Sequence, residues 1–151
     1  MSRRGSGALA AALTAATLMV SGCGSQALSD GQLATQATRL CQLATLQTDR
    51  IPTPTDPSDS ALYLQRGIAV MDGELAQLRK LHAPDDVADV YTVSINSFAK
   101  KLSYMRDTVH DLAKGEDPVL AVRTLQQDLE PVEAQENGAW RTLQINACLS
   151  R

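Results

Sequence analysis

The chain has 151 residues and a formal net charge of −3, with 44% hydrophobic, 21% charged and only 3% aromatic residues. This length and composition are typical of a single globular domain. The few aromatic rings and the acidic balance argue against nucleic-acid binding, which needs stacking rings and a basic surface. No apolar run reaches the roughly eighteen residues of a membrane-spanning helix.

Residues 1–22 contain the three parts of a secretory signal in their usual order. Arg3 and Arg4 give a positive start, residues 7–20 form a short apolar segment rich in Ala, Leu and Thr, and small residues follow. The apolar segment is too short to remain as a span. We therefore expect residues 1–22 to be removed as a signal peptide.

The end of this segment, Val20-Ser21-Gly22-Cys23, resembles the lipobox of bacterial lipoproteins, in which an aliphatic and two small residues precede an invariant Cys. The resemblance implies cleavage before Cys23, a diacylglycerol on its thiol, and often acylation of the new amino terminus. Two or more acyl chains anchor a protein stably, whereas one is marginal. The alternative is a plain signal peptide with an incidental Cys. Residues 23–29 would then be the lipidated Cys and a short tether, and residues 30–151 the folded domain.

Two cysteines remain, Cys41 and Cys148. An even number of cysteines in an exported protein favours a disulfide, which persists outside the cytoplasm. Closing a loop of roughly 100 residues stabilises a fold by about 4–5 kcal/mol in the chain-entropy model. The alternative is a pair of unrelated buried thiols.

The first helix is predicted over 30–48, because Ser29 and Gln32 fit a capping box. Its apolar face would contain Leu33, Ala37, Leu40, Cys41, Ala44 and Thr48. Three prolines between positions 50 and 60 then predict an extended connection, with a proline-recognition motif as the weaker alternative.

A second helix is predicted over 59–81, with a buried stripe at steps of three and four residues. Pro84 followed by Asp85 and Asp86 predicts the start of a third helix, which ends at Lys114-Gly115. The two predicted stripes are Leu64, Ile68, Met71, Leu75 and Leu78, then Tyr91, Ile95, Phe98, Leu102, Met105, Val109 and Leu112.

A fourth helix is predicted from Asp117-Pro118, a cap followed by proline at the first helical position, to near Cys148. Its stripe would be Val122, Leu125, Leu129, Val132, Ala139, Leu143 and Ala147. Pro131 lies inside this run and should kink the helix or divide it near Leu129.

No segment shows the alternation of a strand. Four helices with short turns predict an all-α, up-down-up-down bundle with a Pro-kinked last helix, stapled by one disulfide. The first and last helices are neighbours in this topology, so Cys41 and Cys148 can meet.

Helical bundles often hold metals or haem, and the weak candidate ligands here are His82, His110 and Asp107. Asp107 and His110 share a helix face that lies largely off the buried stripe, and His82 fits a helix end. We therefore expect neither a metal nor a cofactor. A metal- or haem-binding bundle that uses these residues is the alternative function. The basic pairs Arg79-Lys80 and Lys100-Lys101 are interpreted as solvated surface.

No nucleophile–base motif, phosphate loop or haem-attachment motif is present, so we expect no enzyme and no catalytic residues. The layout resembles small exported lipoproteins of uncharacterised function in high-GC Gram-positive bacteria. The similar segments are Leu40-Cys41, the turn Leu78-Arg79-Lys80-Leu81-His82-Ala83-Pro84, and Ala147-Cys148-Leu149. The resemblance implies a location in the cell envelope. Our own interpretation is a non-enzymatic, membrane-anchored extracytoplasmic module that binds an envelope protein or a small apolar ligand.

Overall fold

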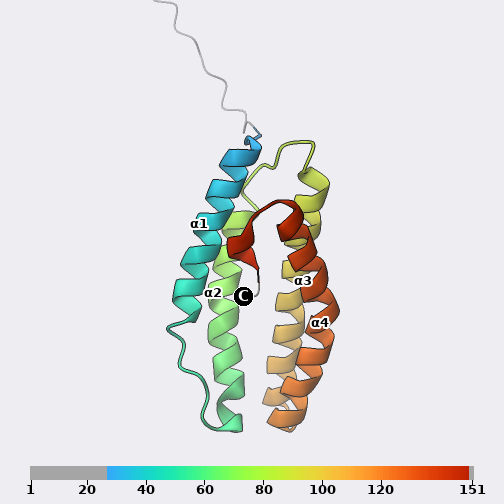
Figure 1. The fold of residues 1–151 in the computed structure, drawn as a ribbon. Coiled ribbons are helices and arrows are strands. Elements are labelled where there is room, and N and C mark those ends of the chain that lie inside the picture. The colour runs from blue at the N-terminus through green and yellow to red at the C-terminus, as the bar shows by residue number, and fades with distance from the viewer. Residues whose placement is uncertain (1–26, 150–151) are drawn as a thin grey trace, which may run out of the picture.

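The computed structural model describes residues 27–149, and it is built from helices alone over that range (Figure 1). The elements in chain order are α1 (Asp30–Thr48), η1 (Pro57–Asp59), α2 (Ser60–Leu78), α3 (Ala88–Ala113), α4 (Pro118–Thr142) and η2 (Asn146–Cys148). No helix in this range is long and apolar enough to span a membrane. The predicted signal peptide and Cys23 lie outside the described residues.

The helix boundaries follow local chemistry read from the sequence. Ser29 Oγ accepts from the backbone N–H of Gln32, and the Gln32 side chain accepts from the N–H of Ser29, which completes the predicted capping box. Asp117 caps α4 by accepting from Leu120 N–H at 2.9 Å. Gly115 follows the end of α3 and has φ +95°, a conformation that prevents the helix from continuing and that glycine adopts at little cost.

The connection between α2 and α3 is longer than predicted. α2 ends at Leu78 and α3 begins at Ala88, so Asp85 and Asp86 precede the helix instead of forming its first turn. The carbonyl of His82 in this connection accepts a bond from Leu28 N–H at 2.8 Å. That bond fixes the start of α1 beside the α2–α3 connection, at one end of the bundle.

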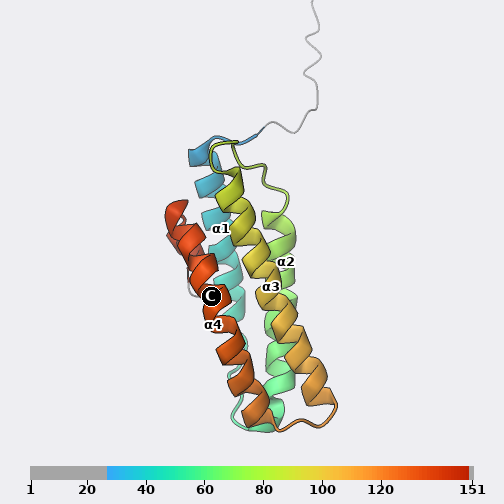
Figure 2. The same ribbon diagram turned by 90° about the vertical axis from the view of Figure 1, so that its right-hand side faces the viewer.

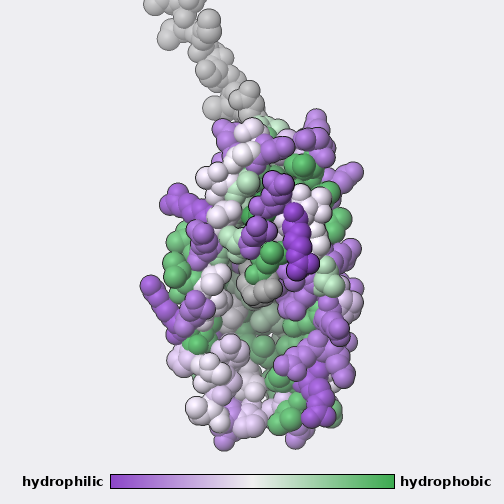
Figure 3. All heavy atoms as spheres, in the orientation of Figure 1, coloured by the Kyte–Doolittle hydropathy of each residue, from purple (hydrophilic) through white to green (hydrophobic). Residues whose placement is uncertain are grey.

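Four antiparallel helices form the bundle, with α3 packed along most of α4 and α2 packed against α3 (Figures 1 and 2). The predicted apolar stripes of α2 and α3 supply much of its interior, which confirms the all-α bundle. The buried core cluster is Leu33, Ala37, Cys41, Leu64, Ile68, Met71, Leu75, Leu78, Tyr91, Ile95, Phe98, Leu102, Met105, Leu125, Trp140, Ile145 and Cys148. Hydrophilic side chains cover most of the face seen in Figure 3, and hydrophobic surface shows in the furrow between α1–α2 and α4.

The carboxyl end of the domain differs from the prediction. α4 continues through Pro131 without division, but it ends at Thr142 and does not reach Cys148. Gln144 adopts φ 59°, in the left-handed region, and the N–H of Ile145 donates to the carbonyl of Trp140 at 2.9 Å. The chain therefore reverses direction after α4, and a short 3₁₀ turn carries Cys148 back between the helices (Figure 1).

This reversal changes how the first and last helices meet. No Cα atom of α1 lies within 8 Å of a Cα atom of α4, whereas η2 packs against α1. The expectation that α1 and α4 are direct neighbours is therefore wrong. The segment after α4 fills the space between them with the buried side chains of Ile145 and Cys148.

Candidate functional site

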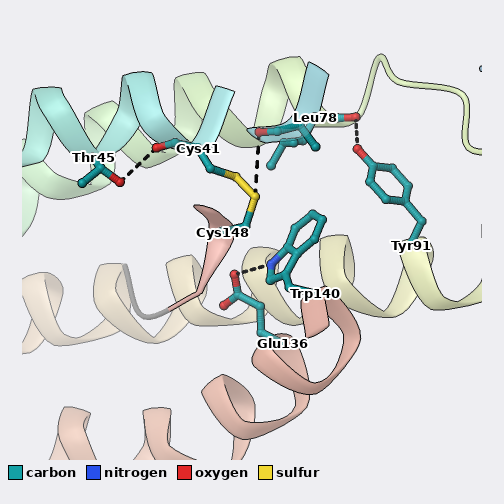
Figure 4. The surroundings of a disulfide bond; sticks show 8 residues. Cys41, Thr45, Leu78, Tyr91, Glu136, Trp140 and Cys148 are labelled. Atoms are coloured by element: carbon teal, nitrogen blue, oxygen red, sulfur yellow. Dashed lines mark hydrogen bonds between the residues drawn. A yellow bond between two sulfur atoms is a disulfide. The ribbon is translucent and has the colours of Figure 1, made fainter. Parts of the chain in front are cut away.

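A disulfide joins α1 to this reversed segment, as the cysteine count predicted. Cys41 and Cys148 are bonded, their Cα atoms are 5.2 Å apart, and they are separated by 107 residues in the chain (Figure 4). Both are essentially inaccessible to solvent. Buried and bonded, this pair has a structural role and offers no thiolate for catalysis.

Two aromatic side chains of the core near the disulfide, Trp140 and Tyr91, link α4, α3 and α2. Trp140 of α4 is fully buried, and its ring meets that of Tyr91 edge to face with centroids 6.0 Å apart. Tyr91 Oη donates to the carbonyl of Leu78, at the end of α2, at 2.7 Å. Burial raises the pKa of the Tyr91 phenol well above its ordinary value, so this hydroxyl remains a donor.

An ion pair lies inside the same core. Lys101 Nζ of α3 is 2.8 Å from Glu136 Oε2 of α4, and the two side chains are 4% and 2% exposed. Trp140 Nε1 donates to the other oxygen of Glu136 at 3.2 Å. The Lys101 ammonium also lies 5.3 Å from the centre of the Phe98 ring, within reach of a cation–π contact.

These buried charges correct the sequence interpretation of Lys100-Lys101 as a solvated pair. Lys100 is exposed, but Lys101 is only 3% exposed. Glu74 of α2 is a third charged residue in the interior, at 5% exposure. A signal for Glu136 was present in the sequence, because it lies four residues after Val132 and four before Trp140, on the buried face of α4.

The weak metal candidates are not brought together. His82, Asp107 and His110 are all exposed, and His110 lies 22 residues into α3, about 33 Å along the helix from its start. His82 precedes that start, so the two histidines lie near opposite ends of the bundle. Within residues 27–149, no group of three or more His, Cys, Asp or Glu side chains is placed to hold a metal ion.

An exposed apolar surface lies at the end of the bundle opposite the start of α1, where α2 and α4 begin (Figure 1). We call it the distal surface. Its exposed members are Pro57, Leu62, Tyr63, Val119 and Leu120, and its half-buried members are Pro54, Pro118 and Val122. A hollow of about 450 Å³ separates the proline segment from the first turns of α4. Val119 and Leu120 are 53% and 55% exposed.

The proline segment is extended and shaped by one acidic cap. The pKa of Asp56 lies below its ordinary value because the Ser58 hydroxyl and the Ser58 backbone N–H both donate to its carboxylate. The hydrogen bond from the Ser58 backbone N–H to Asp56 Oδ1 is 2.8 Å long, and it caps the start of η1. Pro52, Pro54 and Pro57 do not continue α1 but lie in the connection that runs down beside the bundle to the start of α2, as their spacing predicted (Figure 1).

No known protein family, curated protein or solved structure matches this chain.

Proposed function

We propose that this chain is a lipid-anchored protein on the extracytoplasmic face of the cell membrane, where it acts as a non-enzymatic binding module. The observation that carries the proposal is the sequence Val20-Ser21-Gly22-Cys23 directly ahead of a disulfide-stapled domain. A disulfide between buried cysteines is characteristic of an oxidising compartment and rare in the cytosol. The sequence pattern and the disulfide thus support the same location independently.

The placement of the helices gives the anchored domain a defined orientation relative to the bilayer. Six residues separate Cys23 from α1, and six extended residues reach at most about 20 Å. The end of the bundle where α1 begins would therefore face the bilayer. α3 has 26 residues and is about 39 Å long, so the distal surface would face away from the membrane by about that distance.

The distal surface is the proposed contact for a partner protein of the envelope. Isolated apolar side chains are common on protein surfaces, but neighbouring exposed ones beside a hollow often mark an interaction site. Val119 and Leu120 project from the first turn of α4, next to the hollow that Pro118 and Val122 line. Their side chains would bury most of the apolar area at such a contact.

The anchoring is tested by Cys23→Ala in the full chain. This variant should lose incorporation of a labelled fatty acid and move from the membrane fraction to the soluble extracytoplasmic fraction. The double variant Cys41→Ala/Cys148→Ala is the matched control, because it removes two cysteines and should still be acylated. Labelling of Cys23→Ala at the wild-type level would contradict the proposal.

The contact is tested by crosslinking the anchored protein in intact cells. Val119→Asp and Leu120→Asp should each reduce the yield of the major crosslinked species severalfold, because a charge would have to be buried at the contact. Val93→Asp is the control, since Val93 is 38% exposed and lies on α3 away from the distal surface. Equal loss from all three variants would contradict a specific contact there.

A further inference from the structure

The segment Pro52-Thr53-Pro54-Thr55 is the one sequence motif that neither the core nor the proposed contact explains fully. Both threonines are exposed, and they lie in extended chain between α1 and η1. Alternating proline and threonine in an exported protein is the composition of O-glycosylated segments. Proline keeps the backbone extended and free of ladder bonds, so a transferase can reach each hydroxyl.

The hydroxyls of these threonines differ from those of exposed helical threonines. Thr35 and Thr142 are also exposed, but their hydroxyls donate to the carbonyls of Gly31 and Gly138 at 2.7 and 3.0 Å. In the described part of the chain no such bond engages the hydroxyl of Thr53 or Thr55. The two loop hydroxyls are therefore open to reaction, whereas the helical hydroxyls are held against the backbone.

A second observation concerns the space beside the segment. Pro52–Thr55 form one wall of a hollow of about 320 Å³, and Tyr63, Leu62, Arg66 and Asp59 form the other wall. Tyr63 is 40% exposed there. An exposed aromatic face together with a guanidinium and a carboxylate matches the chemistry of a sugar, which has apolar C–H faces and hydroxyl groups that both donate and accept hydrogen bonds.

We infer that Thr53 and Thr55 are acceptors for an O-linked hexose, which rests against Tyr63 in this hollow. In the reaction, threonine Oγ1 forms a bond to C1 of the sugar. The C1–phosphate bond of a phosphate-activated hexose donor breaks, and the hydroxyl proton passes to a base of the transferase. No oxidation or reduction is involved. The inference rests on the proposed function, because it requires that the chain leaves the cytoplasm.

The modification would also cover part of the molecule. Leu62 and Tyr63 are 48% and 40% exposed at the start of α2, beside the proline segment. A sugar in the 320 Å³ hollow would shield these two side chains and leave the hollow beside Val119 and Leu120 open on the other side of the segment. Thr55 borders both hollows, whereas Thr53 borders only the one beside Tyr63.

The test is the intact mass of the full chain isolated from the membrane fraction of the cells that naturally make it. We expect mass gains of about 162 Da per hexose, located by fragmentation to the peptide that contains Thr53 and Thr55. Thr53→Val/Thr55→Val should lose these gains, whereas Thr142→Val should keep them. These variants keep the side-chain shape, and the wild-type mass alone already decides the question if a variant fails to fold.

The outcomes separate this inference from the proposed function. A membrane-anchored chain whose mass shows only lipid overturns the glycosylation and leaves the anchoring intact. A gain of about 80 Da, which indicates phosphate, also overturns it. A chain found only in the cytosol without lipid overturns both.

Discussion

Lys101 and Glu136 form an ion pair that α3 and α4 enclose almost completely. The Nζ–Oε2 distance is 2.8 Å, and the indole of Trp140 satisfies the second carboxylate oxygen. The pair joins the two helices that pack most extensively against each other, and Glu136 lies beside Trp140 on the side of α4 that faces Cys148 (Figure 4). Each charge stabilises the other at this depth, because either one alone would lose its hydration without gaining an opposite charge.

Lys101→Met should therefore lower the free energy of unfolding by about 3–5 kcal/mol, since it leaves the Glu136 carboxylate buried without its cation. Urea unfolding followed by circular dichroism measures the loss. Arg106→Met is the matched control, because Arg106 pairs with Asp72 on the surface and such pairs contribute about 1 kcal/mol or less. Lys101→Met/Glu136→Leu should recover most of the stability. An equal loss from Lys101→Met and Arg106→Met would contradict the role assigned to the buried pair.

Removal of the disulfide should lower stability without changing the helical fold. The double variant Cys41→Ala/Cys148→Ala is expected to lose about 4–5 kcal/mol, because the unfolded chain is no longer closed into a long loop. Thermal unfolding with and without reductant checks this. Reductant should shift the wild-type midpoint to that of the variant and leave the variant unchanged. If reductant left the midpoint of thermal unfolding of the wild type unchanged, the two sulfurs would not be bonded.

Tyr91 should make the domain sensitive to alkaline pH. The pKa of its phenol is raised by burial, whereas an unfolded tyrosine titrates near pH 10. Above about pH 10 the unfolded chain releases this proton and the folded chain retains it, so the free energy of unfolding falls as pH rises. Tyr91→Phe should reduce that decline, and Tyr63→Phe should not, since Tyr63 is exposed. The measurement is a series of unfolding curves at increasing pH, and identical slopes for all three proteins would refute it.

Pro131→Ala should stabilise the domain. Pro131 lies in the interior of α4 and is exposed, so alanine adds a backbone bond and removes a ring without disturbing the core. The gain expected is about 1–3 kcal/mol, because part of the roughly 3 kcal/mol cost of a helical proline is offset by its lower unfolded-state entropy. The melting temperature measures it. Gly31→Ala is a useful reference, because Gly31 is a helical glycine with open space where the alanine Cβ would lie. A lower melting temperature for Pro131→Ala would mean that α4 needs the proline.

Local signals in the sequence predicted the helices well, because each depends on a few neighbouring residues. The Ser29 cap, the Gly115 stop and the apolar stripes of α2 and α3 are examples. The end of α4 could not be predicted in this way. Nothing near Gln144 forbids a helix, and its left-handed backbone reflects the disulfide and the burial of Ile145, which are long-range constraints.

The buried charges show a second feature that could not be predicted from the sequence. Lys101 follows another lysine, and paired lysines are normally solvated, so composition alone suggested a surface position. Its burial depends on Glu136, a residue 35 positions away in a helix whose packing against α3 the sequence does not specify. The distal surface could not be predicted for the same reason, because its residues come from the proline segment and from the starts of α2 and α4. Only the fold brings these residues together.

In the proposed export of the chain, the 107-residue separation of Cys41 and Cys148 would also set an order of events. When a chain crosses a membrane amino end first, Cys41 reaches the oxidising side while its partner is still in the reducing cytosol. In that case the bond would close only after every helix of the bundle had crossed the membrane. Oxidation would thus mark the completion of export, and Cys41 trapped with another thiol would mark chains whose translocation stopped early.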